Sequence, residues 1–128
     1  MKKEIISSSN APKAIGPYSQ AVAVSEGKTI YLSGQIPIDP AVGEITAQDI
    51  KSQTKQVLSN LQNVLKEAGG DLSNIVKTTV FLTDMNNFAA MNEVYAEHFT
   101  ADCPARSTVE VSKLPKNAMV EIEAVAII

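Results

Sequence analysis

The chain has 128 residues, of which 45% are hydrophobic and 20% charged, so its length and composition are those of one globular domain. We therefore expect a single domain over residues 1–128, large enough to fold without a disulfide or a structural metal. The net charge of −3 argues against a general nucleic-acid binder, and no apolar run approaches the roughly 20 residues that cross a bilayer. Cys103 is the only cysteine and no signal peptide follows Lys2 and Lys3, so we expect a cytoplasmic protein.

The first third of the chain is expected to form strands. Residues 4–7 are a candidate edge strand. Residues 21–25 and 29–33 are rich in apolar and β-branched side chains, and they flank the turn sequence EGK at residues 26–28. This pattern predicts that the two strands pair with each other as a hairpin.

A first helix is predicted over residues 50–68, where apolar side chains recur every three or four positions. Thr46 or Asp49 is the expected N-cap, because a short polar side chain there accepts hydrogen bonds from the first free amides. Gly69 and Gly70 are expected to end the helix in a left-handed conformation. A second helix is predicted over about residues 86–99.

The second helix has Asp84 or Asn86 as its expected N-cap. Strands are predicted over residues 76–83, 107–112 and 119–127, and the last two flank the turn sequence LPKN, which predicts a second hairpin. The order is β-β-β-α-β-α-β-β. It indicates an α+β fold in which two helices cover one face of the sheet.

The strand at residues 76–83 predicts which sheet face is left uncovered. Alternate positions suit the helix side, namely Val76, Thr78, Val80 and Leu82. Phe81 then lies on the face that no helix covers. Scattered apolar surface is ordinary, but a whole uncovered face favours association between copies of the chain.

Several kinds of chemistry are not expected. One histidine and one cysteine do not make a metal site within a chain, and the six glycines form neither a P-loop nor a dinucleotide fingerprint. We therefore expect no metal and no cofactor. His98 is interpreted as a surface or capping residue, Cys103 as an unactivated thiol, and Glu93 and Glu97 as a solvated helix face.

Arg106 is the only arginine among 11 basic residues. Its planar fork binds a carboxylate through two parallel hydrogen bonds, which lysine does not do. The alternative is a structural ion pair with Glu110 or Glu123. Glu121 lies on the non-core face of the last strand and is either solvated or a carboxylate that orients or deprotonates water.

Two turn-associated residues have similar alternatives. Tyr18 follows a Gly-Pro turn, and Gly34 ends a strand where a ligand could approach backbone amides closely. Packing and turn formation explain these residues equally well.

Together these segments resemble the RidA/YjgF family. The likeness spans essentially the whole chain, and it is carried by AIGPYSQ at residues 14–20, SGQIP at 33–37, VKTTVF at 76–81, PARS at 104–107, VEV at 109–111, LPK at 114–116 and VEIEA at 120–124. The combination is far more specific than any one of these motifs.

The resemblance implies a chorismate-mutase-like α+β fold with a six-stranded, mainly antiparallel sheet. It also implies a homotrimer in which three sheets form an inner barrel, with ligand clefts between subunits. The implied activity is cofactor-free hydrolysis of 2-imino acids, such as 2-iminopropanoate and 2-iminobutanoate derived from 2-aminoacrylate and its relatives, to 2-oxo acids and ammonia.

The resemblance also assigns roles to individual residues. Arg106 would hold the substrate carboxylate and Glu121 would position the attacking water. The remaining pocket positions would be Tyr18, Ser33, Gly34, Asn92 and Thr108. Many relatives have cysteine where this chain has Thr108, which puts thiol-based regulation at this position in doubt. The hydrolysis hypothesis is little affected if position 108 contributes to the site through its backbone carbonyl.

Two other functions stay open at the level of sequence. Some relatives are described as ribonucleolytic translation inhibitors, but the acidic charge and the lack of a histidine pair weigh against this activity. The third possibility is a non-catalytic protein that binds a metabolite or another protein in the same clefts.

Overall fold

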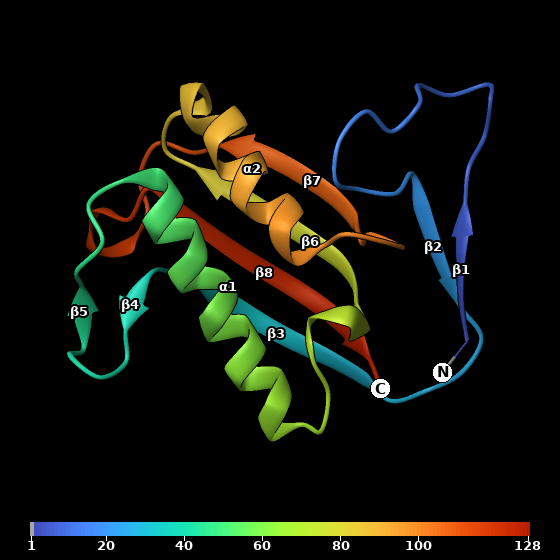
Figure 1. The fold of residues 1–128 in the computed structure, drawn as a ribbon, viewed down its shortest axis with the longest axis horizontal. Helices are drawn as coiled ribbons and strands as arrows, with labels where there is room; N and C mark the ends of the chain where they lie inside the picture. Colours follow the sequence, from blue (N-terminus) through green and yellow to red (C-terminus); the bar gives the residue numbers. More distant parts are fainter. Residues whose placement is uncertain (1) are drawn as a thin grey trace.

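The computed structural model describes residues 2–128 and has an α+β architecture, as expected. Its centre is a four-stranded sheet with two helices packed side by side on one face (Figure 1). The sheet order is β3 (Thr29–Gln35), β8 (Val120–Ile127), β6 (Ile75–Leu82) and β7 (Ala105–Glu110). Only β6 and β7 run parallel, and the other neighbours are antiparallel.

Helix α1 (Ile50–Glu67) begins at Asp49, one of the two predicted caps. The Asp49 carboxylate accepts a hydrogen bond from the Ser52 amide at 2.9 Å, which satisfies one of the free donors of the first turn. Gly69 follows the helix with φ +89°, the left-handed conformation predicted for its end. The apolar side chains that α1 buries completely are Val57, Leu58, Leu61 and Leu65.

Helix α2 (Phe88–His98) begins two residues later than predicted, because a 3₁₀ turn (Met85–Asn87) precedes it. Asp84 caps this turn by accepting from the Asn86 amide at 2.9 Å. The helix buries Met91, Val94 and Tyr95 against the sheet and α1. No helix in residues 2–128 is long and apolar enough to cross a membrane.

Strand β6 supports the predicted assignment of sheet faces. Thr78, Val80 and Leu82 are fully buried on the helix side. The exception is Val76, because an irregularity between Ile75 and Lys77 puts Ile75 into the core instead.

Both predicted hairpins are wrong. Strand β2 (Ala21–Val24) pairs with β1 (Lys3–Ile6), the expected N-terminal strand, and β3 pairs with β8. The backbone of Lys28 bonds to Ile128 in both directions, so the turn connects two sheets and does not close a hairpin. Strand β8 is the central apolar strand and needs partners on both edges, so it lies between β3 and β6 while β7 pairs with β6 alone.

The central sheet therefore has four strands, not the six expected. Strands β1 and β2 form a separate ribbon, which is linked to β7 by a bridge between Ser19 and Ala105. A third small ribbon, β4 (Ile38–Asp39) with β5 (Glu44–Ile45), was not predicted, since two-residue strands have no recognisable alternation.

Candidate active site

Arg106 lies near the start of β7, opposite Thr78 of β6, on the face that the helices cover. Its Nη1 donates to Asn92 Oδ1 of α2 at 2.6 Å. Three aromatic rings surround the guanidinium, with centroids 4.8 to 5.6 Å from Cζ, and they belong to Tyr18, Phe88 and Tyr95. We call these five residues the arginine cluster. Burial lowers the pKa of Arg106, although an arginine remains charged at neutral pH.

Arg106 has no carboxylate partner among residues 2–128. The ion pair found in this part of the chain joins Lys51 to Glu93 instead. Glu110 accepts a hydrogen bond from the Met85 amide at 2.8 Å, and Glu123 lies on the other face of the sheet. A structural ion pair with either glutamate, the alternative considered for Arg106, is therefore wrong. The half-buried cation keeps donors available for an anion from outside the chain.

The N-terminal motif reaches the arginine cluster through backbone contacts. The Ser19 amide donates to Pro104 O at 3.1 Å, and Ser19 Oγ donates to Cys103 O at 2.6 Å. These bonds align residues 18–20 with the start of β7, and so place the Tyr18 ring over Arg106. Segments that are about 85 residues apart in sequence thus build one site.

Tyr95 and Phe88 belong to the cluster but were not predicted as site residues. Tyr95 is completely buried, and its hydroxyl lies 2.7 Å from Thr78 Oγ1. Burial raises the pKa of Tyr95 to about 12. In the sequence both aromatics belong to the apolar stripe of α2. The sequence pattern does not distinguish an aromatic ring that only packs in the core from one that also contacts a cation.

Glu121, Gly34 and Ser33 form a second group, which we call the carboxylate cluster. Glu121 pairs with Phe81 across β8 and β6, so its side chain lies on the face that no helix covers. Gly34 and Ser33 lie in β3, where the pairing with β8 is irregular between Leu32 and Gln35. A Cβ at position 34 would stand 2.8 Å from Glu121 Cδ, which shows how closely the glutamate approaches this backbone.

The two clusters lie on opposite faces of the sheet of one chain. Of the residues predicted for the site, one set contains Arg106, Asn92 and Tyr18, and the other contains Glu121, Gly34 and Ser33. The fold of one chain does not bring these two sets together.

Thr108 shares the strand and the face of Arg106. Its buried Oγ1 has no hydrogen-bond partner within residues 2–128. Position 108 thus lies on the same strand face as Arg106, but no hydrogen bond of the Thr108 side chain ties it to the arginine cluster.

The residues expected to be inert have ordinary environments. His98 is exposed at the end of α2, and its Nδ1 lies 2.9 Å from Val94 O. Cys103 is a free thiol that donates to Phe99 O at 3.3 Å. Glu93 is exposed and pairs with Lys51 at 2.6 Å. No cluster of metal-binding side chains occurs in the described part of the chain.

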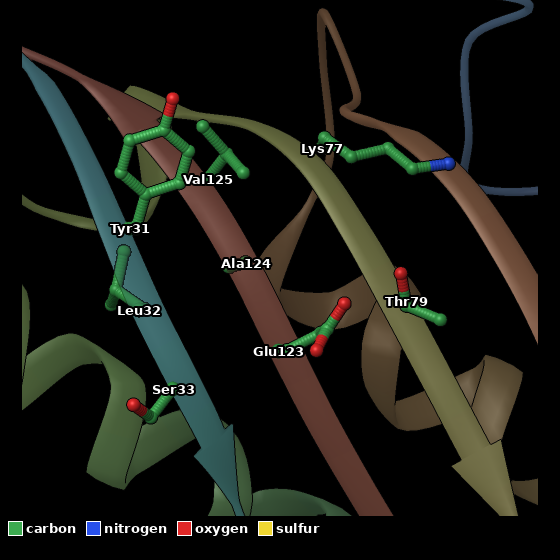
Figure 2. Close-up of a pocket in the computed structure, with 8 residues that line it drawn as sticks. All are labelled: Tyr31, Leu32, Ser33, Lys77, Thr79, Glu123, Ala124 and Val125. Carbon is green, nitrogen blue, oxygen red and sulfur yellow. The ribbon is translucent and has the colours of Figure 1, made fainter.

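The uncovered face carries a shallow cavity of about 250 Å³ (Figure 2). Tyr31 and Val125 stand at one end of this cavity, and Lys77, Thr79 and Glu123 at the other. Lys77 Nζ donates to Ser107 Oγ at 3.2 Å, and Tyr31 is 81% exposed. Tyr31 thus gives the uncovered sheet face a large exposed aromatic side chain.

The chain is similar to known proteins over nearly its whole length. A family model described as Endoribonuclease L-PSP matches residues 8–128. A RutC family protein of Pyrococcus abyssi is 56% identical, and the alignment covers 98% of each chain. The human 2-iminobutanoate/2-iminopropanoate deaminase is 49% identical over 98% of this chain and 90% of its own length. The crystal structure of Escherichia coli TdcF with bound serine superposes with a TM-score of 0.74 at 44% identity, covering 98% of both chains.

The family model covers nearly the whole chain, and the relatives are about half identical to it. The chain therefore belongs to the RidA/YjgF family, the family of the Endoribonuclease L-PSP model.

Proposed function

We propose that the protein is a cofactor-free deaminase that hydrolyses reactive 2-imino acids to 2-oxo acids and ammonia. The observation that carries this proposal is the half-buried Arg106, which has no carboxylate partner within residues 2–128 and is surrounded by aromatic rings. Two relatives add support: the human protein is named for this activity, and TdcF was crystallised with serine, a small molecule that carries a carboxylate.

Arg106 would bind the substrate carboxylate through its guanidinium fork. The hydrogen bond to Asn92 uses one of its five N–H donors and holds the plane of the group. The rings of Tyr18, Phe88 and Tyr95 exclude water from one side and strengthen the remaining hydrogen bonds by lowering the local dielectric. Lysine has no such planar fork, which explains the single arginine at this position.

The chemistry needs one water and one carboxylate. Water attacks C2 of the protonated imine, the C–O bond forms, and Glu121 takes a proton from the water. Glu121 then returns that proton to the amino nitrogen and the C–N bond breaks. The hydroxyl loses its proton to the departing ammonia, so ammonium leaves and the hydroxyl oxygen becomes the carbonyl oxygen of the 2-oxo acid. Because the imine carbon is already electrophilic, positioning and electrostatics supply the required rate enhancement.

The proposed site needs two copies of the chain. Arg106 and Glu121 lie on opposite faces of one sheet, so a single substrate would contact Arg106 of one copy and lie beside Glu121 of the next, where Gly34 and Ser33 would line the cleft through their backbone. A homotrimer with clefts between its subunits, as the family resemblance implies, satisfies this requirement and covers Tyr31 and the rest of the open face.

A coupled assay tests the proposal. Threonine dehydratase with threonine supplies the imine, and the decay of the imine is followed with and without this protein. Arg106→Ala is expected to reduce kcat/KM on the order of 100-fold, since a charge-assisted anchor is lost. The matched control is Lys113→Ala, which removes an exposed cation and is expected to keep full activity. Full acceleration by Arg106→Ala would show that the proposed mechanism is wrong.

The description of the family model favours RNA cleavage as a second candidate. The chain has one histidine, His98, which is exposed at the end of α2, so residues 2–128 hold no pair of histidines for the acid–base steps of RNA cleavage. RNA cleavage that survives rigorous purification and disappears in Arg106→Ala would establish this candidate.

A further inference from the structure

Backbone conformation does not explain why position 34 is a glycine. The glycines with positive φ in residues 2–128 are Gly27, Gly43 and Gly69, and Gly34 is not among them. Its φ thus lies outside the left-handed region in which glycine is favoured over other residues. The need for glycine must therefore come from the space in which a side chain would lie.

That space is filled by the end of the Glu121 side chain. A Cβ on residue 34 would stand 2.8 Å from Glu121 Cδ and 3.1 Å from Cγ, and it would be closer still to Oε2. Carbon atoms at such a separation overlap well inside their contact distance. The carboxyl group of Glu121 thus rests directly against the main chain of β3, in a notch that the missing side chain leaves open.

The local pairing of β3 makes this notch possible. Leu32 pairs with Ala124 and Gln35 pairs with Ile122, so two residues of β3 oppose one residue of β8 between these pairs. Such a bulge bends the strand and takes Ser33 and Gly34 out of the regular ladder. The irregularity and the glycine occur together, next to the carboxylate that the proposed function uses.

We propose that Gly34 is a positioning residue whose missing side chain holds the Glu121 carboxylate at the place from which it directs water. This proposal rests on the proposed deaminase function. The notch removes alternative rotamers, because the carboxyl group packs against main chain on one side. A side chain at position 34 pushes the carboxylate out of the notch and leaves the rest of the fold in place, since the contact involves only the flexible end of Glu121.

The test is Gly34→Ala in the full-length protein, alone and combined with Glu121→Ala. We expect Gly34→Ala to melt at or above the wild-type Tm, because alanine restricts the unfolded chain. We expect kcat for imine hydrolysis to fall on the order of 10-fold to 100-fold with KM near the wild-type value, as for a misplaced catalytic group. In the Glu121→Ala background the same substitution is expected to cause no further loss of kcat.

A crystal structure of Gly34→Ala completes the test, with the Glu121 carboxylate expected to leave its wild-type position. Unchanged kcat, an equal fold-loss in the Glu121→Ala background, an unmoved carboxylate, or failure of Gly34→Ala to fold would each overturn the positioning role. If the wild-type protein did not hydrolyse the imine at all, the proposed function would fail, while the displacement of the carboxylate would still decide whether Gly34 positions it.

Discussion

At the scale of single residues, the arginine cluster depends on a buried polar pair beneath it. Tyr95 packs its ring 4.8 Å from Arg106 Cζ, and its hydroxyl meets Thr78 Oγ1 at 2.7 Å. Both residues are completely buried, so neither hydroxyl has water as an alternative partner. The hydrogen bond therefore fixes the ring against which the guanidinium packs.

This pair leads to a prediction about stability. Thr78→Val leaves the Tyr95 hydroxyl buried without a partner, and Tyr95→Phe leaves the Thr78 hydroxyl without one, so each is expected to cost about 1–3 kcal/mol of unfolding free energy. The double variant leaves neither group unsatisfied, and it is expected to cost less than the sum of the two. Urea denaturation of the four proteins measures the difference. Simple additivity would show that the two hydroxyls do not interact.

Alkaline pH provides a control for the same pair. The pKa of Tyr95 is raised from about 10 in an unfolded chain to about 12 in the fold. The folded protein thus keeps the proton that the unfolded chain releases, and the stabilisation is complete below pH about 10 and lost as pH rises through about 12. The wild-type protein is expected to lose this part of its unfolding free energy between pH about 10 and about 12. The Tyr95→Phe variant has no phenol at this position, so its stability is expected to show no such loss.

At the scale of elements, the start of α1 is held by one carboxylate. Asp49 accepts from the Ser52 amide and from Ser52 Oγ, both at 2.9 Å. The hydrogen bond from the Ser52 backbone is the largest cause that lowers the pKa of Asp49. The cap thus depends on the ionised form of Asp49. Its stabilisation is fully present above the pKa that Asp49 has in the unfolded chain, and it is lost as pH falls through the lowered pKa of Asp49 in the fold.

Asp49→Ala is expected to lower the Tm at neutral pH, because the first turn of α1 loses its side-chain acceptor. The difference from wild type should narrow in acid, where the wild-type carboxylate is protonated. Asp49→Asn is the matched control, since it keeps an acceptor oxygen that does not titrate. Thermal unfolding at neutral and acid pH makes the comparison, and equal Tm values for Asp49→Ala and wild type at neutral pH would contradict a capping role.

At the scale of the whole molecule, the separation of the two clusters by the sheet has a direct consequence. If the site is shared between copies, Arg106→Ala and Glu121→Gln damage different sides of each cleft. A mixed oligomer then contains some clefts in which Arg106 from one chain faces Glu121 from another. With random mixing of equal amounts in a closed ring, roughly a quarter of the clefts have both groups.

Co-expression of Arg106→Ala with Glu121→Gln is therefore expected to restore a substantial fraction of the activity that each variant lacks alone. Light scattering on the same samples is expected to give the mass of a trimer. Glu123→Gln, the neighbouring carboxylate on the same face of β8, serves as the control and should keep activity on its own. Mixed oligomers without recovered activity would contradict a shared site.

Short-range features were predictable from the sequence. The span of α1, the Asp49 cap and the left-handed Gly69 depend on residues within one or two helical turns, and the structure confirms all three. The burial of Val80 and Leu82 follows from an alternation that one strand contains within itself. Family membership also follows from the sequence, because several short motifs occur together along the whole chain.

The tertiary structure alone decided how distant segments pair. A turn such as residues 26–28 is locally compatible with a hairpin, but the central position of β8 takes β3 away from β2 and takes β7 to β6. The same holds for the site: Arg106 was predictable as an unusual residue, whereas the Phe88 and Tyr95 rings around it, and its separation by the sheet from Glu121, were not. Caps and alternation act over a few residues, while strand order and the companions of a buried cation are set by contacts between residues far apart in the chain.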